Sequence, residues 1–437
     1  MDRPNIVFIT CHDLGKHLGC YGQQTVQSPH LDRLAAEGVR FDGAFCTSPL
    51  CSPSRSALHT GRYSHSNGVM GLTHAHFGWR LKRGEKHAAQ LLREEGYAAA
   101  LFGVQHVAEE ASELGYEHAA PIEPAAVLGA QAAEWIRSRQ GAAQPFYLEV
   151  GFFEPHRPYD WRGTRPDDSK GAAIPPYLPV SREAQADTAA LQGMIRQMDL
   201  GVGMVLEALE AAGLSEDTWV IFTTDHGLAM PRAKSTLYDA GIEVALLMRW
   251  PRRGIAGGKR LAGLVSQVDV LPTMLEALAL EAGPLELQGE SFWTMLQEDD
   301  SQGRQAVFAE KNYHARYEPM RCIRTERYKL IVNLEVSLQV DVPSDIVRSP
   351  VYPLMVDDLS RPRPAVELYD LLEDPLEMDN LAESPSHARL RAELTDRLLR
   401  WMQETEDPIL HGPVSSPYYD DALHALTSAV AREGDGG

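Results

Sequence analysis

The chain up to about residue 300 alternates short apolar runs with helical stretches, and this order limits the fold more than any other feature. Strand-like runs at 5–10, 98–103, 146–153 and 219–224 are separated by longer stretches with helical spacing of apolar residues. Such alternation is typical of a mostly parallel sheet sandwiched by helices. We therefore predict a catalytic α/β domain over residues 1–300.

The pattern changes beyond residue 300 to short extended runs followed by one helical stretch at 387–405. This sequence pattern predicts a smaller C-terminal α+β domain, residues 301–437, with an antiparallel sheet. The segment 159–185 is rich in Pro, Gly and charge and is too long for an ordinary connection, so we expect a lid or binding loop there. The last residues, 428–437, are predicted to form a loose tail.

The formal charge of −20 comes from 41 basic and 61 acidic residues that are spread along the chain. This balance argues against nucleic acid and anionic membranes as partners. No basic leader with an apolar stretch and no long apolar span is seen, which predicts a cytoplasmic protein. The five cysteines suggest no disulfide framework, and the oligomeric state stays open, a homo-oligomer included.

Polar residues follow the carboxyl ends of four predicted strands, the edge of an α/β sheet where ligands collect. Each of them alone is as readily a capping aspartate or a satisfied core histidine. Together they predict a metal-assisted active site. The residues are Cys11, His12 and Asp13; Gln105 and His106; Glu154, His156 and Arg157; and Asp225 and His226.

Asp13, Asp225 and His226, with His12, form a candidate set of ligands for one divalent metal. Oxygen ligands alone would favour calcium or magnesium, whereas imidazole in the set moves the preference toward manganese or zinc. The sequence therefore leaves the identity of the metal open.

The stretch "FCTSPLCSPSRSALHTGRY", residues 45–63, places Cys51 at the start of a predicted helix whose first position suits Pro53. Arg55 follows one turn later, so both side chains can lie on the same face as an oxyanion held at the helix N-terminus. The alternative is a buried cysteine before an ordinary helix, with Arg55 in a surface ion pair. The spacing by itself does not decide between the two.

"CSPSRSALHTG" resembles the signature of the sulfatase family, which belongs to the alkaline phosphatase superfamily. The resemblance continues through "RPNIVFITCHDLG", "FGVQHV", "FFEPHRP", "TTDHG", "KSTLYDAGIEVALLMRWP" and "ELYDLLEDPLEMDNLAE", in order along nearly the whole chain. Within the family the sequence is most similar to the N-sulfoglucosamine sulfohydrolases, or heparan N-sulfatases. The segments "CSPSRSALHTGRYSHSNGVMGL", "PMRCIRTERYKLIVN" and "VYPLM" carry that likeness.

The resemblance implies that Cys51 is oxidised to formylglycine by a formylglycine-generating enzyme, and that one metal, calcium in the family, assists catalysis. It implies hydrolysis of a sulfamate or sulfate ester of a saccharide, as in heparan sulfate degradation. The hydrated aldehyde would attack sulfur, and His106 would take the proton whose loss releases sulfate. Arg55 would stabilise the nucleophile, while His156 and Lys234 would hold the sulfuryl oxygens and assist the leaving group.

Two departures from the family pattern affect the metal. Sulfatases usually carry two aspartates where this chain has His12 and Asp13, and often Asp-Asn where it has Asp225 and His226. Both changes replace an oxygen ligand by nitrogen. The Asp-His pair also resembles the phosphonate monoester hydrolases, which act on phosphodiesters, so a hydrolase of that kind is an alternative.

The third departure is Val104, which stands where many sulfatases have a lysine. Either another cation such as Arg157 compensates, or the preferred ester differs. His65 and Arg232 are further candidates for binding substrate, against plain structural roles for both. A catalytically silent binder of sulfated sugar, with Cys51 never converted, is the third functional class that the sequence leaves open.

Overall fold

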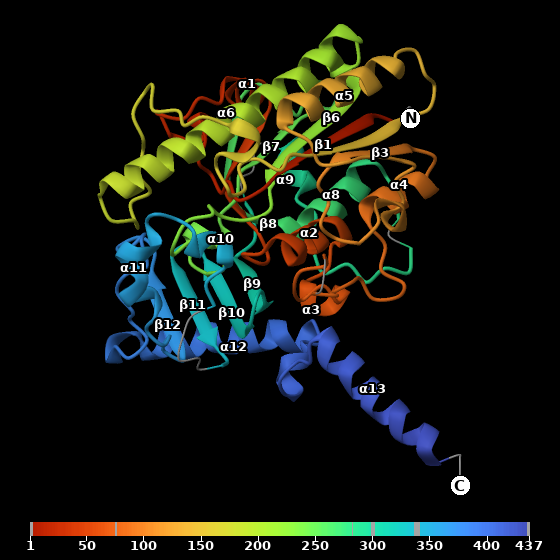
Figure 1. Cartoon of the computed structure of the whole chain (residues 1–437). Helices are drawn as coiled ribbons and strands as arrows, with labels where there is room; N and C mark the ends of the chain where they lie inside the picture. Colours follow the sequence, from red (N-terminus) through yellow and green to blue (C-terminus); the bar gives the residue numbers. More distant parts are fainter. Residues whose placement is uncertain (1–2, 75–76, 282, 299–301, 336–340, 435–437) are drawn as a thin grey trace.

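The fold is described from a computed structural model, which covers residues 3–74, 77–281, 283–298, 302–335 and 341–434. Two sheets organise these residues, a large one in the N-terminal part and a small one in the C-terminal part (Figure 1). Among the described residues no helix is both long and apolar enough to cross a bilayer.

The large sheet has eight strands in the order β4-β3-β5-β1-β6-β7-β2-β8. All neighbours pair in parallel except β7, which is antiparallel to both β6 and β2. The predicted mostly parallel sheet is therefore confirmed. The strands are β1 (Asn5–Cys11), β2 (Val39–Phe45), β3 (Ala98–Gly103), β4 (His118–Ala120), β5 (Phe146–Gly151), β6 (Thr218–Thr224), β7 (Leu246–Arg249) and β8 (Lys259–Ser266).

Helices cover both faces of this sheet (Figure 1). Alternate residues of β1 supply both cores, because successive strand side chains point to opposite faces. Ile6 and Phe8 belong to one core, while Val7 and Ile9 belong to the other. One layer consists of α1 (Pro29–Glu37), α5 (Ala125–Ser138) and α6 (Arg182–Ala211), and the other of α2 (Cys51–Thr60), α4 (Ala88–Glu94) and α8 (Val270–Ala277).

Three strands of the large sheet, β2, β4 and β8, were not predicted. In β2, Asp42 and Gly43 interrupt the apolar pattern, and the pairing with β8 shifts register between Phe41 and Gly43. β4 has only 3 residues. Such segments are strands because their neighbours supply hydrogen-bond partners, and their own sequence gives a weak signal.

The small sheet is antiparallel, as predicted, with the order β12-β11-β10-β9. Leu394, Leu398 and Trp401 of α12 pack on it. Its strands and helix are β9 (Ala306–Tyr313), β10 (Tyr317–Thr325), β11 (Tyr328–Asn333), β12 (Val366–Asp370) and α12 (Ala388–Glu404). The predicted domain boundary at residue 300 lies outside the described residues and stays a prediction.

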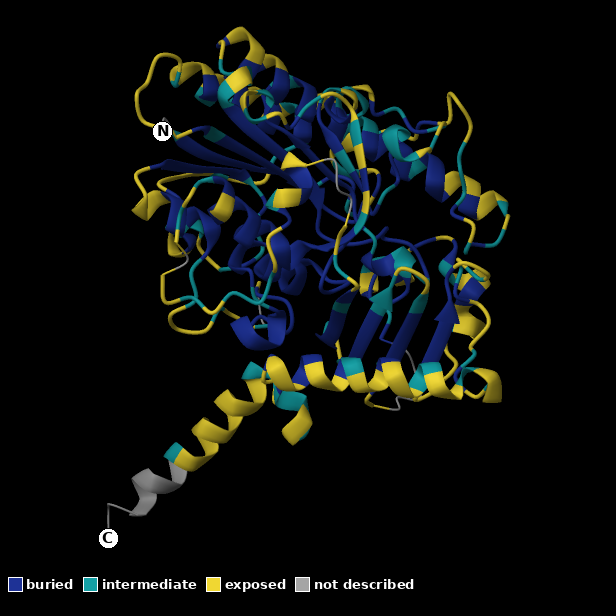
Figure 2. Ribbon diagram, turned by 180° about the vertical axis from the view of Figure 1, so that it is seen from behind, coloured by how far each residue is buried: buried dark blue, intermediate teal, exposed yellow. Residues whose placement is uncertain are grey.

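The C-terminal helix α13 (Pro417–Gly434) extends away from the rest of the chain, and its residues 418–427 are exposed (Figure 2). The predicted tail from residue 428 belongs to this helix as far as 434, and 435–437 lie outside the described residues. The remaining short helices are α3 (Ser64–Asn67), α7 (Asp239–Ile242), α9 (Trp293–Gln297), α10 (Ser344–Val347) and α11 (Tyr352–Leu359).

Candidate active site

The four strands whose ends carry polar residues, β3, β5, β1 and β6, are neighbours in the sheet and run parallel. Their registers pair Thr10 with Gly151 and Cys11 with Thr224, so the strands end at the same edge. Just past the ends, Asp13 and His106 have φ angles of 50° and 54°. Non-glycine residues rarely adopt this left-handed backbone, and strain of this kind is concentrated at functional sites.

The four candidate metal ligands converge at this edge. Asp225 Oδ2 lies 2.9 Å from His12 Nδ1, and its Oδ1 accepts the backbone N–H of Asp13 at 2.9 Å. His226 Nε2 lies 3.1 Å from Asp13 Oδ1. One ligand atom from each of His12, Asp13, Asp225 and Cys51 falls within 4.8 Å of the others.

This group of side chains fits a divalent metal. His12 Nε2 is buried and has no hydrogen-bond partner among the described residues, so this nitrogen is available to bind an ion. Burial alone would raise the pKa of Asp225, but His226, His12 and Arg55 together hold this pKa well below its usual value. The carboxylate is therefore ionised, and the mixed set of oxygen and nitrogen suits manganese or zinc as well as calcium.

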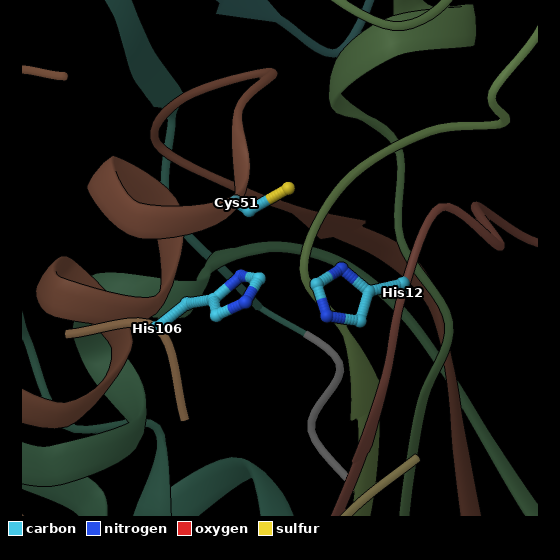
Figure 3. Close-up of side chains that lie close together, drawn as sticks. All are labelled: His12, Cys51 and His106. Atoms are coloured by element: carbon cyan, nitrogen blue, oxygen red, sulfur yellow. The ribbon is translucent and has the colours of Figure 1, made fainter. Parts of the chain in front are cut away.

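Cys51 is the first residue of α2, so Pro53 occupies the third helical position and the prediction that it starts the helix is wrong. Cys51 Sγ lies 3.5 Å from His226 Nε2, and the side chains of Cys51, His12 and His106 lie close together (Figure 3). Burial raises the pKa of the Cys51 thiol well above its usual value. Because the thiolate is the reactive form, an unmodified Cys51 would be a poor nucleophile.

Arg55 is fully buried, which excludes the alternative of a surface ion pair. Its guanidinium donates to Thr10 Oγ1 at 3.1 Å and to the carbonyl oxygen of Cys11 at 2.9 Å, and it lies 3.3 Å from Asp225 Oδ2. It therefore adds a fixed positive charge behind the ligand cluster.

His106 follows β3 and faces the same space. Its ring centroid lies 5.0 Å from that of His12 and 5.2 Å from that of His74, a neighbour that was not predicted to belong to the site. Burial first, and then the charges of His12 and Arg55, lower the pKa of His106 well below its usual value. A neutral imidazole of this kind can accept a proton.

The more open end of the site holds His156, Lys234 and Asp345. Lys234 Nζ lies 2.8 Å from Asp345 Oδ2, 3.1 Å from Asp13 Oδ2 and 3.4 Å from His156 Nε2. Oxygen and nitrogen atoms of Asp13, His156 and Asp345 are close enough to bind an ion, but the Lys234 ammonium already lies among them. Burial would lower the pKa of Lys234, but the two carboxylates raise it well above its usual value, so it stays charged.

Asp345 was missed by the sequence analysis. It lies in α10, 111 residues after Lys234, and no spacing connects the two. The preceding Pro-Ser is a signal for a helix start but says nothing about which element that helix approaches.

The three residues predicted to bind substrate are engaged elsewhere. Arg157 forms a buried ion pair with Asp187, and His65 Nδ1 lies 2.9 Å from Glu310 Oε1 with no exposed side-chain surface. Arg232 donates to two backbone carbonyl oxygens of the C-terminal part and lines a cavity of about 430 Å³. These contacts give each residue a partner within the protein, and substrate binding by the three residues stays a prediction.

Arg157 is also the cation that was expected to replace the lysine absent at position 104, and its contacts bear on that role too. Val104 is buried next to β5, and the Arg157 guanidinium is held by Asp187, by the carbonyl oxygen of Ala229 and by the ring of Tyr159. The charge of Arg157 is therefore already neutralised within the protein.

Comparisons with known proteins identify the family of this chain. A family model described as sulfatase matches residues 4–280, and one described as the C-terminal region of N-sulphoglucosamine sulphohydrolase matches residues 226–343. The human N-sulphoglucosamine sulphohydrolase is 28% identical, with 94% of this chain and 92% of the human protein covered. An ulvan-active sulfatase of Formosa agariphila is 28% identical, with 95% of this chain and 83% of that protein covered.

Solved structures show the same fold. A putative sulfatase from Bacteroides fragilis superposes with a TM-score of 0.76 at 21% identity, covering 95% of this chain and 98% of the other. The phosphonate monoester hydrolase of Agrobacterium radiobacter gives 0.72 at 20% identity, covering 94% and 97%. The fold is thus of the class that a putative sulfatase and a phosphonate monoester hydrolase share. Within that class the chain belongs to the sulfatase family and is a sulfuric ester hydrolase.

Proposed function

We propose that this enzyme removes sulfate from a saccharide, preferably from a sulfamate such as that of N-sulfoglucosamine and otherwise from a sulfate ester. It would do so through formylglycine derived from Cys51 and with one divalent metal. The observation that carries the proposal is the position of Cys51, the first residue of α2, among His12, Asp13 and Asp225. A formylglycine-generating enzyme of the host would be the partner that converts it.

Asp13, Asp225 and His12, with His226 beside them, would hold the metal, which when bound would supply positive charge to the nucleophile and the sulfuryl group. The formylglycine hydrate would supply an oxygen nucleophile and a second hydroxyl whose deprotonation frees sulfate. Conversion also removes the difficulty of a buried thiol whose pKa is raised, since no thiolate is needed.

The side chains around the nucleophile would each have a separate role in the reaction. His106, neutral because of burial and neighbouring positive charge, would accept the proton of the second hydroxyl. Lys234 would hold a sulfuryl oxygen with its ammonium, and His156 would pass a proton from Nε2, which lies 3.4 Å from Lys234 Nζ, to the leaving atom. Arg55 would act on the strand ends and the nucleophile as a fixed cation.

The preference for a sulfamate is supported by the match to the C-terminal region of N-sulphoglucosamine sulphohydrolase and by the human relative of that name. The second candidate is a phosphonate monoester or phosphodiester hydrolase. It is favoured by His226, which puts an imidazole beside Asp13 and Cys51 at 3.1 and 3.5 Å.

Mass analysis of the nucleophile peptide tests the mechanism. Trypsin releases residues 41–55, which contain both Cys46 and Cys51, so fragment masses must assign the change. We expect an aldehyde at 51 and an unmodified thiol at 46, which serves as the internal control. A thiol at both positions in fully active enzyme would overturn the formylglycine mechanism.

Turnover tests the reaction. Glucosamine N-sulfate, glucosamine 6-sulfate and a phosphodiester should be compared for the converted enzyme and for Cys51→Ala, which should release no sulfate. Clearly greater activity on the diester would favour the second candidate. Sulfate release that is unchanged in Cys51→Ala would remove residue 51 from the mechanism, and binding of sulfated sugar without turnover would indicate a silent binder.

Metal content tests the ligand set. Metal analysis of the purified enzyme should find one equivalent of calcium, manganese or zinc, and Asp13→Asn should lose it together with activity. Full retention of the metal by this variant would contradict the assignment.

A further inference from the structure

The open end of the site holds Asp345, a hydrogen-bond acceptor, beside His156 and the Lys234 ammonium. His156 Nε2 lies 4.0 Å from Asp345 Oδ2. A substrate atom that lies beside Lys234 Nζ, and not in its place, can be about 3 Å from both, which is hydrogen-bond distance. Lys234 Nζ contacts both side chains, at 3.4 and 2.8 Å, and borders the same space.

This space is where the leaving group of a substrate must lie. Cys51 is only 5% exposed, whereas the side chains of His156 and Asp345 are 23% and 17% exposed. A substrate that presents its sulfur to residue 51 must extend its remaining part toward the more exposed groups. The atom that joins sulfur to the sugar is then the first atom to meet His156 and Asp345.

The two groups have complementary hydrogen-bonding roles. Asp345 Oδ2 lies 2.8 Å from the Lys234 ammonium in an ion pair, so its carboxylate is ionised and only accepts hydrogen bonds. His156 Nδ1 faces the carbonyl oxygen of Arg157 at 2.5 Å and donates to it, which leaves Nε2 to act on the substrate. Nε2 lies 3.4 Å from the Lys234 ammonium, which only donates, so Nε2 accepts from this neighbour and can draw from it the proton that it gives to a substrate.

Sulfamates and sulfate esters differ at this joining atom. The nitrogen of R–NH–SO₃⁻ carries one hydrogen and one lone pair, so it needs one acceptor and one donor. The oxygen of R–O–SO₃⁻ carries no hydrogen, and a carboxylate next to it is an acceptor that faces lone pairs. A site built to bind an N–H rejects an analogue without it far more strongly than a hydrophobic pocket rejects a missing methylene.

We propose that Asp345 accepts the N–H of a sulfamate substrate and thereby sets the preference for N-sulfate over O-sulfate. The assignment rests on the proposed function and adds to it the residue that distinguishes nitrogen from oxygen at the leaving atom. Asp345 also holds Lys234, so its effect on selectivity must be separated from its effect on the position of that cation.

The hydrogen bond fits a balanced reaction. The S–N bond breaks, its electron pair stays on nitrogen, and a new S–O bond forms to an oxygen that water ultimately supplies. Protonated His156 gives its Nε2 proton to nitrogen, which leaves as the amine with both hydrogens. Asp345 gains and loses no proton; it orients the N–H so that the nitrogen lone pair faces His156.

A matched pair of compounds tests the assignment, because N-(4-nitrophenyl) sulfamate and 4-nitrophenyl sulfate differ only in N–H against O. The readout is the ratio of kcat/KM for the sulfamate to kcat/KM for the ester. Asp345→Ala should lower this ratio about 10- to 100-fold, the value of a hydrogen bond to a charged group. Asp345→Asn, whose amide oxygen still accepts, should give an intermediate ratio.

Two controls complete the experiment. Lys234→Ala should lower kcat/KM for both compounds and change the ratio of the two values little. Asp358→Ala removes an exposed carboxylate of α11 and should leave both the kcat/KM values and their ratio unchanged. Equal losses on both compounds in Asp345→Ala would show that Asp345 only positions Lys234 and would overturn the assignment. If converted wild-type enzyme hydrolyses neither these compounds nor the sugar sulfates, the proposed function fails and the assignment fails with it.

Discussion

His17 offers a quantitative test of how burial affects this fold. It lies in the loop after β1 with its side chain buried, and its Nε2 has no hydrogen-bond partner among the described residues. Burial lowers the pKa of His17 from 6.5 to about 4. The unfolded chain therefore binds the proton more readily, so the stability that this group contributes is complete above pH 6.5 and is lost as the pH falls toward 4.

The size of this loss follows from the fall of the His17 pKa from 6.5 to about 4 on folding. At about 1.4 kcal/mol per unit, the full loss is about 3 kcal/mol, and about 2 kcal/mol of it is reached at pH 5. His17→Gln keeps a polar side chain but does not titrate. The free energy of unfolding of this variant, relative to wild type, should therefore rise by about 2 kcal/mol between pH 7.5 and pH 5.

The measurement is urea unfolding followed by tryptophan fluorescence at both pH values, with a chelator present so that metal binding adds no pH dependence of its own. His118→Gln, at an exposed position of β4, is the matched control and should follow wild type. A constant difference between His17→Gln and wild type at the two pH values would refute the argument from burial.

Three further predictions concern single side chains. Lys234→Ala should lower kcat/KM for sulfate release about 100- to 1000-fold, measured by sulfate assay, because it removes a buried cation from the site; a loss below tenfold would contradict that role. Arg321→Leu leaves the fully buried Asp407 without its ion pair, so the free energy of unfolding should fall by about 3–5 kcal/mol, and an unchanged urea midpoint would show that this pair is dispensable. Gly151→Ala would place Cβ 1.9 Å from the carbonyl oxygen of Val104, so a lower melting temperature in calorimetry is expected, and an unaltered one would mean that the strand end can shift.

The sequence by itself predicted the α/β layers, the antiparallel C-terminal sheet and the edge at which Asp13, His106 and Asp225 collect. These features follow from local information, because apolar periodicity identifies strands and helices, and parallel strands with helical crossovers bring their carboxyl ends to one edge. The position of Cys51 at a helix start was also readable, although the helix begins two residues before Pro53.

Only the tertiary structure decided which side chains are available for chemistry. Arg157 and His65 were candidates for substrate binding, but Asp187 and Glu310, 30 and 245 residues away in sequence, pair with them. Asp345 joins the site across 111 residues. A charge or a histidine looks the same in sequence whether its partner is a substrate or another side chain, because burial and pairing depend on contacts between distant segments.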